Sequence, residues 1–300
     1  MTSTQRKEQA ADDAFNTPEL TVIVLVYNES SNLPHCFRLI EAWAKLARIA
    51  GIEVLFVDDA SSDASASMCE RTVALWHSDP ELKTVLHARL VRRTQNGGIG
   101  AALRTGVTEA TGRWVSFLPA DGQVSPFALT TLYRATQMPA QGPATNTRDG
   151  AGKGATVAPA LVLSVYSDRQ DGAVRRLLSS GVRALITALY ARRLRSDGPY
   201  LFRRELFDPA ELVSESFFLN FEFPLRALRG GVPFSVVSVH CATRLFGNSK
   251  SAGWRTTARV AKDLAYLRLH LLRGQKWLQP PRGGETTDAS AAPSFEHGSK

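Results

Sequence analysis

The chain has 300 residues, of which 44% are hydrophobic and 21% are charged, and this is the composition of an ordinary globular protein with enough length to bury a core. Its net charge of +8 favours nucleic acid, phosphorylated ligands or an anionic membrane surface as partners. The three cysteines are far apart and the six histidines lack metal-ligand spacing, which argues against a disulfide framework and a zinc cluster. Because no apolar run reaches the roughly 18 residues needed to span a bilayer, we expect a cytoplasmic protein, either soluble or peripheral on the inner face of the membrane.

Short apolar runs rich in β-branched residues alternate with helical segments along the first half of the chain. The runs at 21–27 and 53–57 have the composition of strands that are buried on both faces. A third strand is expected at 86–92, and a fourth begins at Trp114 after the helix breaker Gly112. This alternation predicts βαβ units and a mostly parallel sheet, which is the α/β fold class. The helices between the strands are expected at about 31–50, 61–76 and 100–111.

The second half of the chain adds two strands and two basic helices. The strands are expected at 160–166 and 233–240, and the helices at 171–195 and 254–278. Polar, glycine-rich or proline-rich segments lie at both ends of the chain and in one long internal connection. The expected organisation is a disordered arm at 1–18, a globular domain at 19–252 with a flexible loop at 139–156 and an amphipathic helix at 171–195, a C-terminal amphipathic helix at 253–279, and a disordered tail at 280–300.

Acidic side chains follow three of the four strands in the first half. Glu29 follows the first strand, Asp58 and Asp59 follow the second, and Asp121 follows the fourth. The carboxyl ends of parallel strands meet at one edge of a sheet, where open α/β sheets bind their ligands. Carboxylates there accept hydrogen bonds from a ribose or a base, and Asp121 with the amide oxygen of Gln123 suits a hard divalent cation that holds a diphosphate. Each acid alone reads more simply as a helix cap or a turn residue, but their joint placement favours a binding site.

A glycine-rich turn, Asn96-Gly97-Gly98-Ile99-Gly100, precedes the third expected helix. Glycines at such a position let the backbone approach a ligand closely and direct helix N-terminal amides at a phosphate. A dinucleotide-binding fold would have a third glycine at position 103 and would place the turn after the first strand. Here position 103 is a leucine and the turn follows the third strand, so a nicotinamide-binding fold is disfavoured.

These segments resemble the successive sequence blocks of inverting family 2 glycosyltransferases of the GT-A fold, and most closely those of the dolichyl- and polyprenyl-phosphate sugar synthases. The resemblance covers about residues 20–252. In the nucleotide half the blocks are Thr21–Glu29, the Asp58–Asp63 turn, Asn96–Gly112 and Leu118–Pro126. In the acceptor half they are Tyr166–Asp171 with Arg175 and Ser179, Asp197–Arg204, Glu222 where the family has a glutamate before a helix, and Arg244–Lys250, which matches an R-x-x-G-x-S-K closing motif.

The resemblance implies a role for the residues at matching positions. Asp121, Arg244 and Lys250 would serve catalysis, and Asp121 with Gln123 would hold Mg²⁺ or Mn²⁺ against the donor diphosphate. Lys250 is alternatively a solvated charge at a helix start, and Glu222 is alternatively an ordinary helix residue. The donor, a UDP- or GDP-sugar, would be bound by Tyr27, Glu29, Asp58, Asp59, Asn96, Gly98 and Ser249. The polyprenyl phosphate acceptor would be bound by Arg169, Arg175, Arg203 and Glu222.

Two positions depart from the family pattern. Leu25 stands where the family usually has a proline, two residues before Tyr27. Pro119 stands where the metal motif usually opens with an aspartate, two residues before Asp121. The loss of one carboxylate is expected to weaken metal binding or to change the ligand set.

Basic residues and apolar stripes coincide in two segments of the second half. The segment 174–204 carries eight arginines against the single acid Asp197, and the segment 254–278 repeats the pattern. Basic amphipathic helices of this kind suit the interface of an anionic membrane. The alternative is that each helix packs its apolar stripe on the core and leaves a solvated basic face. Nucleic acid is disfavoured as a partner because no recognised nucleic-acid motif accompanies the charge.

The expected function is transfer of a sugar from a nucleotide-sugar donor to polyprenyl phosphate at the membrane surface, with inversion and a divalent metal. The phosphate of such a lipid is mostly ionised near pH 7, so it needs orientation by arginines more than it needs a general base. Asp121 is the candidate base if the acceptor is a hydroxyl. One alternative is an enzyme of the same fold with a soluble, natural-product or polysaccharide acceptor. The other is an inactive module that binds sugar nucleotides, as Pro119 suggests.

Overall fold

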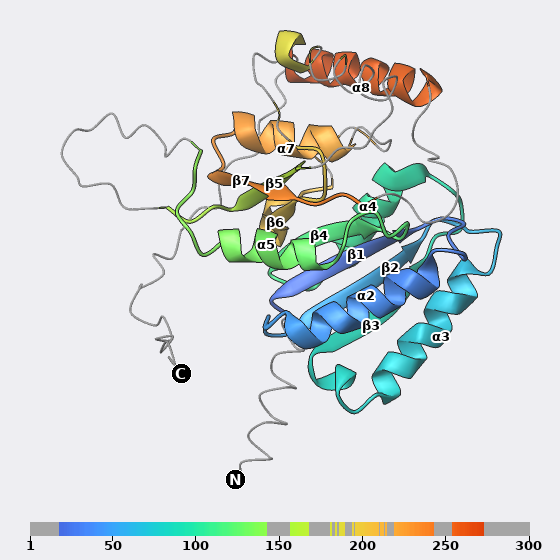
Figure 1. Ribbon diagram of the computed structural model, residues 1–300. Helices are drawn as coiled ribbons and strands as arrows, with labels where there is room; N and C mark the ends of the chain where they lie inside the picture. The colour runs from blue at the N-terminus through green and yellow to red at the C-terminus, as the bar shows by residue number, and fades with distance from the viewer. Residues whose placement is uncertain are drawn as a thin grey trace, which may run out of the picture.

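A seven-stranded sheet lies between layers of helices in the computed structural model of the chain (Figure 1). The strand order across the sheet is β3-β2-β1-β4-β6-β5-β7. The structure describes residues 18–142, 157–167, 196–209, 219–242 and 254–272, together with 181, 184, 186–189, 194, 211, 212 and 214. The strands are β1 (Leu20–Val26), β2 (Ile52–Asp58), β3 (Leu86–Arg92), β4 (Trp114–Pro119), β5 (Leu161–Tyr166), β6 (Leu201–Arg203) and β7 (Phe234–Val239).

Six of these strands run in one direction, and β6 runs against them. β1 pairs in parallel with β2 on one side and with β4 on the other, and β2 pairs in parallel with β3. β6 is antiparallel to β4 and to β5, and β7 is parallel to β5. Every residue of β1 and β2 is buried, as expected for strands covered by helices on both faces. The α/β class and the mostly parallel sheet are confirmed.

Alternate residues of the central strands face two separate cores, one on each side of the sheet. Val22 and Val24 of β1 pack with the helices α2 (Leu33–Leu46), α3 (Ser65–Ser78) and α5 (Phe127–Ala135). Ile23 and Leu25 belong to the core of α4 (Gly98–Glu109), α7 (Leu219–Arg229) and α8 (Trp254–Leu272). α8 lies beyond α7 as an outer layer (Figure 1). The chain also forms the short 3₁₀ helices η1 (Leu82–Thr84) and η2 (Arg204–Leu206).

The two basic segments place apolar residues in the core. Val260, Leu264 and Leu267 of α8 are buried against the core that contains α4 and α7. The described residues 181, 184 and 186–189 are helical, and Ile186 is buried in the same core. These residues support core packing of the apolar stripes, the alternative to a membrane-facing stripe. The expected arm before Pro18, the loop beyond 142 and the tail lie outside the described residues.

Candidate active site

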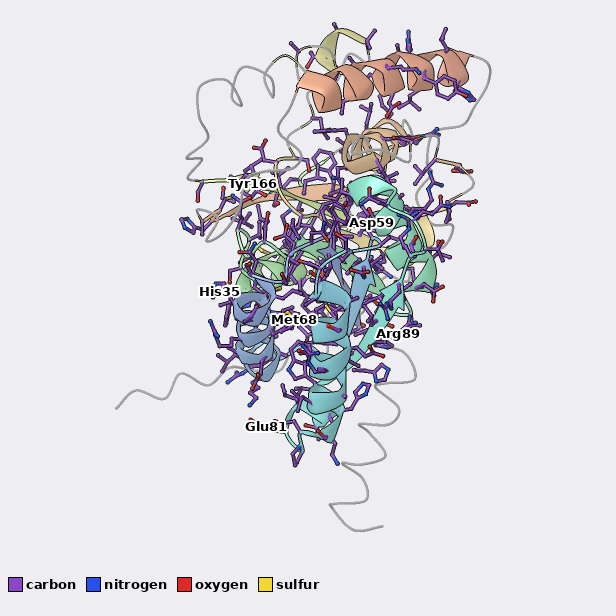
Figure 2. All side chains as sticks on the ribbon, turned by 90° about the vertical axis from the view of Figure 1, so that its right-hand side faces the viewer. His35, Asp59, Met68, Glu81, Arg89 and Tyr166 are labelled. Carbon is purple, nitrogen blue, oxygen red and sulfur yellow. The ribbon has the colours of Figure 1, made fainter. Side chains whose placement is uncertain are left out.

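The acidic turns after β1, β2 and β4 meet at one edge of the sheet. The last residue of β1 lies opposite Asp58, which ends β2, and β4 ends beside the preceding residue of β1. The turns that carry Glu29, Asp59 and Asp121 are therefore neighbours, which confirms that these strand ends converge. Figure 2 labels Asp59, which follows the end of β2, and Tyr166, which ends β5.

The turns after β1 and β2 are joined by side chains of the segment 61–63, where the helix at 61–76 was expected to begin. Asn28, with a left-handed φ of 51°, donates its amide to Ser61 Oγ at 3.0 Å, and Ser30 donates its amide to Asp63 Oδ2 at 3.1 Å. As a result α3 begins at Ser65 rather than at 61–63. Burial disfavours the charge on Asp63, but hydrogen bonds from Ser65 and Ser30 outweigh it and lower the pKa of Asp63 to about 2.

Glu29 is buried beside the amino end of α2. Its amide donates to Ser65 Oγ at 2.9 Å, and its carboxylate accepts from Asn32 Nδ2 at 2.6 Å. Burial, followed by the charges of Asp121 and Glu29, raises the pKa of the Cys36 thiol to about 12. The two carboxylates therefore act on the same buried thiol, and that thiol stays protonated at neutral pH.

The carboxylate of Asp59 binds the glycine-rich turn. Its Oδ1 accepts from the Gly97 amide at 3.0 Å, and its Oδ2 accepts from the Gly98 amide at 2.7 Å. The Arg93 guanidinium also donates to Oδ1, and Asn96 Nδ2 donates to the backbone carbonyl of Asp59 at 3.2 Å. The structure thus brings Asp59, Asn96 and Gly98 together as predicted, but the two glycine amides are directed at a protein carboxylate rather than at an open phosphate site.

Asp58 differs from Asp59 because one of its carboxylate oxygens is unpaired. Its Oδ2 accepts from the Ser61 amide at 3.2 Å, whereas its buried Oδ1 has no hydrogen-bond partner among the described residues. An unsatisfied buried oxygen costs about 1–3 kcal/mol, and such groups are rare in folded proteins. Asp58 is therefore an acid with a buried, unpaired oxygen at this edge, where Tyr27 is partly exposed.

Asp121 and Gln123 form a tight turn directly after β4. The Gln123 amide donates to Asp121 Oδ1 at 3.1 Å, and Gly122 between them has a φ of 72°, which favours glycine. The Asp121 residue is only 7% exposed. The carbonyl of Gln123 accepts from the Ala242 amide at 2.8 Å. This bond ties the turn to the segment after β7, two residues before Arg244.

Pro119 occupies a strand position that does not require an amide hydrogen. The amides of Trp114 and Ala120 donate toward β1, at 2.9 and 3.0 Å. Because successive amides of a strand point to opposite sides, the nitrogen of Pro119 points toward β6. The pairing of β4 with β6 has already ended at Val115. No ladder hydrogen bond is lost, so the sheet tolerates proline where an acid was expected.

The ligands at this turn suit a metal ion that is shared with a substrate. Within the described part of the chain, no group of three or more His, Cys, Asp or Glu residues is arranged to hold a metal. Asp121 and Gln123 offer a carboxylate and an amide oxygen, which hard divalent cations prefer. Mg²⁺ is usually held by one or two carboxylates together with substrate phosphates. These residues therefore fit a cation whose coordination a diphosphate completes.

Arg203, one of the expected acceptor residues, is not at this edge. Arg203 lies opposite Trp114 at the start of β4, roughly 16 Å along the strand from its carboxyl end, and its guanidinium carbon is 5.0 Å from the Trp114 ring centroid. Glu222 lies within α7 rather than before it. It is fully buried, and accepts from Arg226 Nε at 2.9 Å and from the Ser214 amide at 2.8 Å. Both residues make contacts that support the fold.

Five further expected site residues fall outside the described residues, and their roles stay predictions. They are Arg169, Arg175, Arg244, Ser249 and Lys250.

Two arginines at the site were not expected from the sequence. Arg93 contacts the acidic turn, and its position directly after β3 was a signal that could have identified it. Arg104 of α4 donates to the carbonyls of Pro209, Leu212 and Ser214, and so joins the nucleotide half to the acceptor half. No sequence pattern marks Arg104.

Solved structures share this sheet architecture over most of the chain. The chain resembles glucosyl-3-phosphoglycerate synthase from Mycobacterium tuberculosis in complex with Mn²⁺, UDP and glucosyl-3-phosphoglycerate, with a TM-score of 0.58 and 18% identity over 86% of this chain and 82% of that one. It also resembles S. aureus TarS 1–349 in complex with UDP-GlcNAc, with a TM-score of 0.51 and 16% identity over 83% of this chain and 66% of that one. The GT-A fold is thereby confirmed.

The family follows from the sequence comparison. The model of glycosyl transferase family 2 matches residues 21–179, which is just over half of the chain. The chain belongs to this family.

Curated relatives include enzymes that use undecaprenyl phosphate. The chain is 28% identical over 241 residues to undecaprenyl-phosphate 4-deoxy-4-formamido-L-arabinose transferase of Salmonella paratyphi A, covering 79% of this chain and 64% of that protein. It is 30% identical over 116 residues to glycosyltransferase GlyA of Streptococcus pneumoniae, covering 39% of this chain and 15% of that protein. The chain thus spans less than two thirds of the length of either relative.

Proposed function

We propose that this protein is a glycosyltransferase that moves a sugar from a nucleotide-sugar donor to polyprenyl phosphate, with inversion. The similarity to an undecaprenyl-phosphate transferase carries the proposal, because it extends over 79% of the chain and so includes the half beyond the nucleotide-binding strands. The geometry supports it, since the turns after β1, β2 and β4 and the segment after β7 meet at one edge.

The donor, a UDP- or GDP-sugar, is proposed to lie along the edge between Asp58 and Asp121. Asp58, whose Oδ1 has no partner among the described residues, is proposed to accept a hydrogen bond from the nucleoside, with Glu29 and Tyr27 beside it. Asp121 and Gln123 would hold Mg²⁺ or Mn²⁺, and such a cation offsets the charge that develops on a leaving diphosphate. The Mn²⁺ and UDP in the Mycobacterium tuberculosis structure support a divalent cation and a nucleoside diphosphate.

The acceptor phosphate is proposed to be oriented by basic residues of the second half. Arg244, Ser249 and Lys250 belong to the segment that follows Ala242, and the amide of Ala242 binds the Gln123 carbonyl beside the proposed metal. Arg169 and Arg175 are proposed to complete the phosphate contacts. Bidentate arginine contacts fix the direction of a phosphate, and an ionised phosphate oxygen needs no general base. Arg203 and Glu222 would support this arrangement indirectly, through the contacts described above.

The protein is proposed to act at the inner face of a membrane through basic surface helices. No helix of the described chain is long and apolar enough to cross a bilayer. The inner stripe of α8 is buried, but Tyr266 and Leu269 on its outer side are 50% and 53% exposed, near the exposed Lys262. Apolar side chains between basic ones suit the interface of an anionic bilayer.

A second candidate function is transfer to a soluble phosphorylated acceptor. The structure of glucosyl-3-phosphoglycerate synthase in complex with phosphoglyceric acid has the same fold over 86% of this chain. Core packing of the α8 stripe also removes one reason to require a membrane.

A transfer assay with purified protein, UDP- and GDP-sugars and Mn²⁺ or Mg²⁺ separates these functions. One acceptor is undecaprenyl phosphate in anionic vesicles, and the other is phosphoglyceric acid in solution. Lipid-linked sugar of inverted anomeric configuration is expected. Turnover of the soluble acceptor alone would refute the lipid acceptor, and nucleotide binding without transfer to any acceptor would favour an inactive binding module.

The metal assignment is tested by Asp121→Ala and Gln123→Ala, with Glu81→Ala as the control. Glu81 is exposed far from Asp59 (Figure 2). Both site variants are expected to lose metal-dependent transfer and the rise in melting temperature that Mn²⁺ with UDP or GDP gives the wild type. If both keep full activity, the assignment is wrong.

A further inference from the structure

The carboxylate of Asp59 joins three elements that are distant in the sequence. The amide of Asp59, directly after β2, donates to the last carbonyl of β1 at 2.9 Å. Its carboxylate binds the Gly97 and Gly98 amides at the start of α4, and it also binds Arg93, which directly follows β3. An ionised carboxylate has about four acceptor positions, so these three donors nearly saturate it. Asp59 is therefore held by the protein, whereas Asp58 has a buried oxygen without a partner among the described residues.

Arg93 balances the charge of this buried acid and covers the glycine turn. The Asp59 side chain is 4% exposed, and the side chain of Arg93 is 22% exposed. The Arg93 amide donates to the Asp58 carbonyl at 2.9 Å, which fixes its backbone beside the acidic turn. A Cβ added to Gly97 would lie 2.7 and 2.9 Å from the two terminal nitrogens of Arg93, so the guanidinium lies directly against this glycine.

Among the residues that the structure describes, the glycine turn has no comparable alternative support. Gly98 has a φ of 81°, and no atom would lie within 4 Å of a Cβ added there. The Asn96 side chain donates to the Asp59 carbonyl, so it depends on the same residue. The helix α4 has no side-chain cap from its own N-cap residue, Gly97, and the Asp59 carboxylate takes that place. Without Asp59, the first amides of α4 would be left to solvent.

We propose that Arg93 and Asp59 form a positioning pair that holds the turn Asn96-Gly97-Gly98 in the geometry that binds the nucleotide donor. The proposal rests on the proposed function, in which this edge binds a nucleoside diphosphate. Arg93 holds the buried carboxylate in place against the glycine amides, and these amides set the direction of α4. The pair acts through the turn, and neither side chain is required to touch the donor.

The first experiment measures the turn itself, without any ligand. Hydrogen exchange of the amides in 94–103 is compared in the wild type, Arg93→Ala, Asp59→Ala and the double variant. Arg92→Ala is the control, because Arg92 is the exposed neighbour on β3. Exchange in this segment is expected to rise about tenfold or more in both single variants and no further in the double variant, since the pair acts as a unit. Unchanged exchange in Arg93→Ala would overturn the proposal.

The second experiment measures UDP and GDP binding by calorimetry with Mn²⁺, and the kinetic constants for the sugar-nucleotide donor. Arg93→Ala is expected to weaken nucleotide binding and to raise the donor KM about tenfold or more, with a kcat change below about threefold. Arg93→Lys, which keeps the charge but not the planar fork, is expected to recover part of the affinity. An equal loss in Arg92→Ala, or an Arg93→Ala variant with wild-type nucleotide affinity, would overturn the donor role.

The two experiments separate this proposal from the proposed function. A wild type that binds neither UDP nor GDP contradicts the proposed function and the donor role of the pair together. If the wild type binds nucleotide, and Arg93→Ala has a loosened turn but the same nucleotide affinity, only the proposal of the positioning pair is contradicted.

Discussion

The buried pair of Glu222 and Arg226 gives the sharpest test of how the acceptor half is held together. Both side chains of the pair are 0% exposed, and the Arg226 Nε to Glu222 Oε1 distance is 2.9 Å. The other oxygen of Glu222 accepts from the Ser214 amide at 2.8 Å, and Ser214 Oγ donates to Asp263 Oδ2 of α8 at 3.4 Å. The Ser214 carbonyl accepts from Arg104 of α4 at 2.8 Å. Glu222 thus anchors a junction of three helices.

The magnitude follows from what Glu222→Ala leaves behind. The guanidinium of Arg226 loses a carboxylate at a site without solvent, and breaking a buried ion pair from one side typically costs about 3–5 kcal/mol. The Ser214 amide also loses its acceptor. Folded proteins are stable by about 5–15 kcal/mol in total, so we expect a large fraction of the stability to be lost. Glu205→Ala, at an exposed acid of η2, is expected to change stability by less than about 0.5 kcal/mol.

Urea unfolding followed by circular dichroism measures this difference. A loss below about 1 kcal/mol in Glu222→Ala would refute the reasoning. The double variant Glu222→Leu with Arg226→Met removes both charges and is expected to recover most of the stability, because apolar replacement of a buried pair is often neutral. If this variant is stable but has lost transfer, Glu222 also has the acceptor role that the sequence suggested. If transfer persists, the residue is structural.

Three further outcomes are expected. Gly106→Ala should destabilise the protein by about 1–3 kcal/mol in urea unfolding, because the added Cβ would lie 2.5 Å from a buried side chain of β1. The control is Gly181→Ala, whose added Cβ meets nothing within 4 Å and which should be neutral or slightly stabilising. The pKa of Asp63 falls from 3.8 to about 2 on folding, so its contribution to stability is present above about pH 4 and is lost toward pH 2. In thermal unfolding, Asp63→Asn should therefore be less stable than the wild type at pH 7. The stabilities of the two proteins should converge near pH 2. Leu269→Glu should reduce sedimentation of the protein with anionic vesicles, whereas the control Leu46→Glu on α2 should not. An equal reduction in both variants would exclude the outer side of α8 as the docking face.

The central strands could be predicted from the sequence because burial on both faces requires continuous apolar runs. The expected bounds of the first three strands lie within one residue of β1, β2 and β3. The strand β6 was missed because three residues carry no periodic pattern, and its antiparallel pairing with β4 and β5 depends on contacts with distant segments. Arg203, the last residue of β6, was predicted near the acceptor from the family resemblance, whereas the register places it beside Trp114 at the opposite edge.

The helix stripes show a related limit. The spacing of Leu264 and Leu267 predicts an apolar face, but periodicity does not reveal which surface covers that face. Both residues pack into the core with α7, so the outer side of α8 faces solvent with Tyr266 and Leu269. The pattern is the same for a membrane helix and for a core helix, and only the position of the neighbouring elements distinguishes them.

By itself, the sequence determined the family, the parallel sheet and the edge at which Glu29, Asp58 and Asp121 gather, because strand composition and motif order are local properties. The tertiary structure decided which of these groups are already paired. Asp59 is bound by Arg93 and the α4 amides, whereas the buried Oδ1 of Asp58 has no partner among the described residues. The donors that bind the Asp59 carboxylate lie 34–39 residues away from it in the sequence. No local sequence pattern specifies which donor reaches which carboxylate oxygen.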